Sequence, residues 1–208
     1  MEEPTRNLTA AEQKRRERFC ATEERLKSEG YTPHNLTVSI IQANLLGTLI
    51  AAIPCIPFIV AYFYLNRTIS ELSQLQWLIF IAIFVALIVV HEAIHGLFWS
   101  FGAQNGLKDI EFGFIVKYLT PYCTCSSPLK KTAYIIGTFM PMFLLGICVM
   151  LAAVIMGNQL MMILGVVNTL AGAGDILVIL KLLSYKTKGK DIVIIDHPYE
   201  AGLVVFER

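Results

Sequence analysis

The sequence predicts an all-α membrane protein with about four transmembrane helices, a short β hairpin-like loop and a small β-containing tail. Hydrophobic residues make up 55% of the 208 residues and charged residues 16%, whereas a soluble domain is about 45–50% apolar and 25% charged. The apolar residues gather in four runs, each long enough for a helix that crosses a bilayer. The net charge of +1 and the absence of a basic stripe give no reason to expect a nucleic-acid partner.

The first segment, residues 1–36, is the most highly charged part of the chain. It holds seven Lys or Arg and seven Asp or Glu, which is typical of a solvated helix before the first span. It has no apolar core of the kind found in a secretory signal peptide, so we expect no such signal.

Four spans are expected to form a membrane core over residues 37–184. Their ranges are 37–65, 77–101, 132–156 and 159–184, and proline interrupts the first at Pro54 and Pro57 and the third at Pro141. The third and fourth spans are separated by little more than two residues, so they should form a tight antiparallel pair.

Two segments outside the spans have the composition of strands. Residues 110–118 are β-branched and aromatic, and Pro121 and Pro128 are expected to break the chain after them. In the tail, residues 185–208, two short strands at 192–195 and 203–206 flank a turn-like link.

Basic residues are concentrated in the N-terminal segment, the long loop at 102–131 and the tail, which four spans place on one side of the membrane. The positive-inside rule makes that side cytoplasmic. We therefore expect an integral multi-pass protein with both termini in the cytoplasm.

The second span carries the sequence His91-Glu92-Ala93-Ile94-His95, an H-E-x-x-H motif. On a helix the two histidines project from one face, about 6 Å apart along the axis. This spacing suits two imidazoles that bind one Zn²⁺ per chain, with Glu92 placed to polarise a water. Such a cluster is costly in hydrocarbon unless something binds it.

A catalytic zinc usually takes three protein ligands, and Asp175 is the only acid in the fourth span. His91 and His95 lie roughly 22–28 Å along their span and Asp175 roughly 24 Å along its own. The three side chains can therefore meet in one plane, nearer the cytoplasmic face. The residues before Asp175, 171–174, are all small and permit close helix contact.

Other roles for the polar residues remain possible from the sequence. The trio of His91, His95 and Asp175 would also suit a polar cluster that pins helices together, or an ion pathway. His34 is expected to be exposed, and His197 to be a turn residue rather than a ligand. Cys123 and Cys125 form a C-x-C pair that favours ordinary loop cysteines over a metal site.

These motifs resemble those of the putative zincin peptidase family of small bacterial membrane proteins, related to site-two-type intramembrane metalloproteases. The resemblance rests on residues 91–96, on Pro141, and on Asn168 followed by Gly174-Asp175. It implies that Asp175 is the third zinc ligand and that Asn168 binds substrate, in a bacterial cell membrane. The related motif's proline is absent here, and Ile176 replaces the glycine after its aspartate.

The function expected is that of a zinc-dependent intramembrane endopeptidase that hydrolyses membrane-associated protein or peptide substrates. Glu92 would take a proton from a water activated by zinc and pass it to the leaving amine. Residues 110–118 offer an edge for an extended substrate. The alternatives are a metal-binding or ion-transporting membrane protein, or an inactive relative that binds substrate helices. Small-residue helix faces also permit a homo-oligomer.

Overall fold

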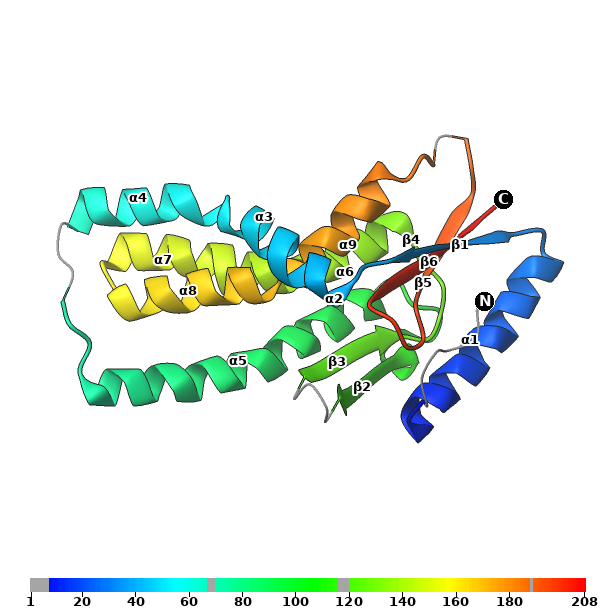
Figure 1. The fold of residues 1–208 in the computed structure, drawn as a ribbon, viewed down its shortest axis with the longest axis horizontal. Helices are drawn as coiled ribbons and strands as arrows, with labels where there is room; N and C mark the ends of the chain where they lie inside the picture. The colour runs from blue at the N-terminus through cyan, green and yellow to red at the C-terminus, as the bar shows by residue number, and fades with distance from the viewer. Residues whose placement is uncertain (1–7, 67–69, 116–119, 188) are drawn as a thin grey trace.

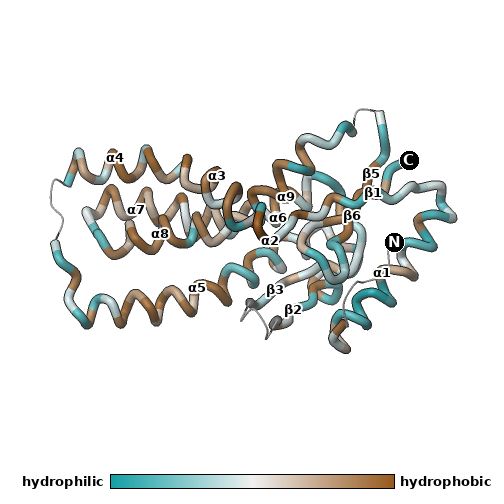
Figure 2. Tube along the Cα trace, in the orientation of Figure 1, coloured by the Kyte–Doolittle hydropathy of each residue, from teal (hydrophilic) through white to brown (hydrophobic). Residues whose placement is uncertain are grey.

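The computed structural model describes residues 8–66, 70–115, 120–187 and 189–208. The molecule is elongated, with a bundle of helices at one end and two sheets with helix α1 (Ala10–Ser28) at the other (Figure 1). The helices of the bundle are apolar along most of their length, and α1 is mainly polar (Figure 2).

The bundle consists of helices that match the expected spans closely. They are α2 (Ile40–Gln42), η1 (Ala43–Gly47), α3 (Thr48–Ala52), α4 (Cys55–Asn66), α5 (Gln74–Ser100), α6 (Lys131–Pro141), η4 (Met142–Cys148), α7 (Val149–Met156), α8 (Gln159–Ala171) and α9 (Ala173–Ser184).

Two helices, Gln74–Ser100 and the continuous Lys131–Met156, are long and apolar enough to cross a membrane. Two further pairs pass the same test together, although each is bent at a short break. They are Asn44–Ala52 with Cys55–Asn66, bent by 43°, and Gln159–Ala171 with Ala173–Ser184, bent by 48°. The described residues therefore provide two candidate spans, or up to four if each bent pair counts as one.

Local sequence explains each interruption. The first bent pair breaks at Pro54, which cannot donate a helical hydrogen bond. In the third span Pro141 ends regular α-helix, and the wider turns of the π-helix η4 follow it. The second bent pair breaks at Gly172, which has a non-helical ψ of 17°. Chain direction therefore changes immediately before Asp175.

The larger sheet is antiparallel and has the strand order β1-β6-β5-β4. Its strands are β1 (Thr32–Thr37), β4 (Leu129–Lys130), β5 (Ile192–Asp196) and β6 (Gly202–Glu207). Successive β6 side chains point to opposite faces. Leu203 and Val205 pack towards the helical bundle, whereas Val204 and Phe206 pack with Phe19 of α1. The sheet is therefore a layer between α1 and the bundle.

Strand β1 corrects the expectation of a helical segment over residues 1–36. Helix α1 ends at Ser28, and residues 32–37 pair with β6 over their whole length. The sequence of β1 has no clean apolar alternation, and its partner is far away in the chain. The tail strands, by contrast, are confirmed to within one residue at each end.

The smaller sheet is a hairpin of β2 (Ile110–Ile115) and β3 (Thr120–Cys125). The expected strand at 110–118 is confirmed as far as residue 115, and its remaining residues lie outside the described part of the chain. The expected break at Pro121 was wrong, since Pro121 lies within β3 opposite Phe114. Proline is tolerated there because both strands of a two-stranded sheet are edges.

Candidate metal centre

The H-E-x-x-H motif lies in the last third of α5, where the helix reaches the sheet end of the molecule. His91 and His95 are one turn apart and both buried, at 9% and 4% exposure. Their Nε2 atoms are 3.1 Å from each other. The motif therefore presents two ring nitrogens to a single point.

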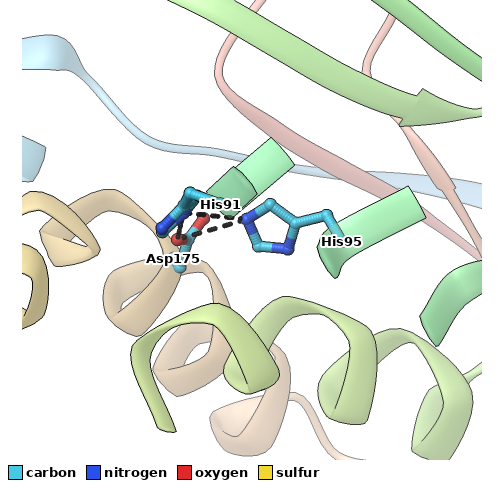
Figure 3. Close-up of side chains that lie close together, drawn as sticks. All are labelled: His91, His95 and Asp175. Carbon is cyan, nitrogen blue, oxygen red and sulfur yellow. Dashed lines mark hydrogen bonds and ion pairs between the residues drawn. The ribbon is translucent and has the colours of Figure 1, made fainter. Parts of the chain in front are cut away.

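Asp175 comes to the same point from the first turn of α9 (Figure 3). Its Oδ2 atom lies 3.2 Å from His91 Nε2 and 3.5 Å from His95 Nε2. The bend at Gly172 aims α9 and its carboxylate at α5. In the described residues, these three side chains form a group able to hold a metal ion.

The separations of these donors fit a zinc ion. Zinc binds histidine nitrogen and carboxylate oxygen at about 2.0–2.2 Å in tetrahedral geometry, so neighbouring donors should be about 3.3 Å apart. The three distances, 3.1, 3.2 and 3.5 Å, bracket that value. Two imidazoles and one carboxylate are also a donor set that leaves the fourth position open.

The second nitrogen of His95 is held by the neighbouring helix α6. His95 Nδ1 lies 2.9 Å from the carbonyl oxygen of Gly137. Because a carbonyl can only accept, Nδ1 carries the proton and Nε2 keeps its lone pair for a metal. Gly137 also allows close helix approach, since a Cβ there would overlap the Trp99 ring.

Glu92 is half-buried and faces the hairpin. Its carboxylate interacts with the Cys123 backbone on β3. The hairpin reaches the motif because residue 96 is glycine. A Cβ at Gly96 would lie 2.7 Å from Phe112 Cζ and 2.8 Å from Ile110 Cγ2. The hairpin therefore lies directly against the motif helix, a contact that the sequence analysis did not predict.

Stacked aromatic rings and hydrogen bonds connect the metal centre to the larger sheet. The His95 ring stacks on Trp99 at 5.0 Å, and Trp99 stacks on Tyr134 at 5.5 Å. The Tyr134 hydroxyl donates to Asp196 Oδ1 at 2.6 Å, and the Cys125 N–H donates to Asp196 Oδ2 at 3.1 Å. One carboxylate at the end of β5 thus binds both α6 and the hairpin. No sequence motif marks Asp196, because its partners are distant in the chain.

Other residues that the sequence analysis considered lie elsewhere. Asn168 is buried in α8, and its Nδ2 donates to the Leu164 carbonyl at 2.8 Å. Its substrate-binding role stays a prediction. His34 is on β1, 3.1 Å from Glu207. His197 lies in the turn after β5, as expected, but is buried, and its Nδ1 accepts the Glu200 N–H at 3.0 Å.

Cys123 and Cys125 are both buried in β3, and both thiols are free. Burial raises the pKa of each thiol. The expectation of loop cysteines was wrong, because both residues lie within a strand that pairs with β2.

The family model described as putative zincin peptidase matches residues 84–189. The matched range contains the motif, the hairpin, the third span and Asp175. No curated protein and no solved structure matches the chain.

The buried carboxyl of Asp196 predicts that the stability of the protein depends on pH. Burial raises the pKa of this carboxyl, and donation from Tyr134 and from the Cys125 N–H opposes the shift. The folded state therefore holds this proton more tightly than the unfolded chain, where the pKa is about 3.9. The contribution of this group to the free energy of unfolding is fully present below about pH 3.9, and it is lost as pH rises through the pKa of the folded state.

Asp196→Asn should remove this dependence. We expect the melting temperature of the wild-type protein, relative to this variant, to fall as pH rises from about 4 to 8. Thermal unfolding followed by circular dichroism in detergent measures it. Parallel curves for the two proteins would contradict the assignment.

Proposed function

Because the chain belongs to the putative zincin peptidase family, we propose that it is a zinc-dependent endopeptidase that acts within the membrane. The observation that carries this proposal is the convergence of His91, His95 and Asp175 on one point at zinc-donor spacing. The proposed substrates are membrane-associated proteins or peptides.

In the proposed site, His91 Nε2, His95 Nε2 and an Asp175 oxygen hold one zinc ion. When bound, zinc supplies a Lewis acid that lowers the pKa of a water to about 7 and polarises the scissile carbonyl. The Gly137 carbonyl keeps His95 in the tautomer that binds.

Glu92 is the proposed general base. It sits between the two histidines in sequence and beside β3 in space. It accepts a proton from the attacking water and gives it to the leaving amine. The hairpin against the motif helix offers an edge on which an extended substrate can pair, so its peptide bond would lie near Glu92.

The proposed orientation in the membrane follows from the positions of the soluble elements. The two sheets and α1 lie at one end of the bundle (Figure 1). The metal centre lies towards that end, because its two histidines are in the part of α5 that packs against the hairpin. The positive-inside rule makes that end cytoplasmic. Water would then reach the site from the cytoplasm, in a bacterial cell membrane.

The alternatives, an ion-transporting protein and an inactive relative, share the three donors but give no role to Glu92. An inactive relative needs no base between its ligands. The variant of this residue therefore separates the proposals.

Glu92→Gln should keep zinc and lose proteolysis. The amide has nearly the same shape, but it cannot accept the proton of the attacking water, and general-base catalysis is worth roughly 10²–10⁴-fold. Metal content of the purified variant and cleavage of a membrane substrate in proteoliposomes measure the two effects. Cleavage at the wild-type rate would remove Glu92 from the mechanism.

Asp175→Ala and His91→Ala should each lose bound zinc, because each removes one of three donors. Metal content after purification, measured beside the wild-type protein, tests this expectation. Gly174→Ala is a suitable control, since a Cβ there meets nothing within 4 Å. Full zinc occupancy in either ligand variant would refute the proposed coordination.

A reporter protein fused after Arg208 tests the orientation. It should be active in the cytoplasm, because the tail sheet that contains β6 lies at the proposed cytoplasmic end. A reporter signal from the opposite side of the membrane would overturn the topology.

A further inference from the structure

The first bent pair contacts the helix that carries Asp175 at one tight point. Gly47 ends the π-helix η1 and is buried. It lies against Ala173, the first residue of α9 and only two residues before Asp175. Residues far apart in the sequence thus meet beside the metal centre.

The contact leaves no room for a side chain at position 47. A Cβ built at Gly47 would lie 2.9 Å from the Ala173 carbonyl carbon, and closer still to its oxygen. Real Cβ atoms essentially never come within 3.0 Å of another heavy atom. The obstacle is backbone, which cannot rotate away as a flexible side chain can. Even alanine at this position would force one helix to move by several tenths of an ångström.

The chain has contacts on both sides of Gly47, so moving η1 away from α9 is costly. Before it, the Thr37 carbonyl accepts a hydrogen bond from Lys181 Nζ of α9 at 2.5 Å. After it, Ala51 and Cys55 are buried at 0% and 1% exposure. Part of the displacement therefore falls on the beginning of α9, which carries Asp175.

A shift of this size matters at a metal centre, where donor distances are held within about 0.2 Å. Asp175 is in the same helical turn as Ala173, so its carboxylate moves with that backbone. We propose that Gly47 is a positioning residue, which sets the place of the Asp175 carboxylate relative to the two histidines. The inference rests on the proposed function, because it takes the three residues to be zinc ligands.

The test compares two glycine-to-alanine variants. Gly47→Ala should weaken zinc binding roughly 10–100-fold, the usual effect of losing a group that orients a ligand. Gly174→Ala is the matched control, because it adds the same methyl group next to Asp175 but in open space. It should bind zinc as the wild-type protein does. Competition with a chromophoric chelator measures each affinity.

A second readout distinguishes positioning from a general loss of stability. The visible absorption of bound Co²⁺ reports its ligand geometry, so Gly47→Ala should change that spectrum relative to the wild-type protein. Circular dichroism should show a folded protein in each case. If Gly47→Ala is not recovered folded, Ala173→Val replaces it, because it adds bulk to the same contact from the α9 side. The two γ-methyl groups of valine cannot both point away from Gly47. It should weaken zinc binding in the same direction.

The inference, but not the proposed function, would be overturned if the folded Gly47→Ala variant had wild-type zinc affinity and an unchanged Co²⁺ spectrum. The same holds for Ala173→Val where it replaces that variant. An equal loss in Gly174→Ala would also overturn it. A wild-type protein that binds no zinc would overturn the proposed function, and the inference with it.

Discussion

The structure depends on bringing one carboxylate and two imidazoles together between apolar helices. Each group alone would be costly in such surroundings. Together they could hold a divalent ion, and their geometry has the spacing that a tetrahedral ion requires. The interruptions in the bundle serve this convergence. The bend before α9 directs Asp175 towards α5, and the glycines at 47, 96 and 137 allow three different elements to approach closely.

The elements outside the bundle are built around the same point. The hairpin packs on α5 at Gly96, and the tail sheet packs between the helix ends and α1. Asp196 joins these layers, because its two oxygens accept from α6 and from β3. The wall of the metal centre is therefore made partly by the two sheets, and the stability of those sheets affects the site.

Local patterns predicted much of this arrangement. The spacing of His91 and His95 depends only on helix geometry, and the depth of Asp175 follows from counting residues along two spans. What could not be predicted depends on contacts between distant segments. Strand β1 has little strand character of its own and exists because β6 pairs with it. Pro121 reads as a break, although an edge strand tolerates it. The roles of Gly137 and Asp196 become visible only when α6 and β5 are placed beside the motif helix.

The pairing of β1 with β6 also has a consequence for synthesis of the protein. These strands lie at residues 32–37 and 202–207, so the sheet cannot close until all of the intervening chain has left the ribosome. The spans come out before that moment, and with them the H-E-x-x-H helix and Asp175. An unfinished polypeptide therefore has its three donors but lacks the layer that binds α6 and the hairpin through Asp196. The wall of the metal centre is therefore completed only after β6 has been synthesised.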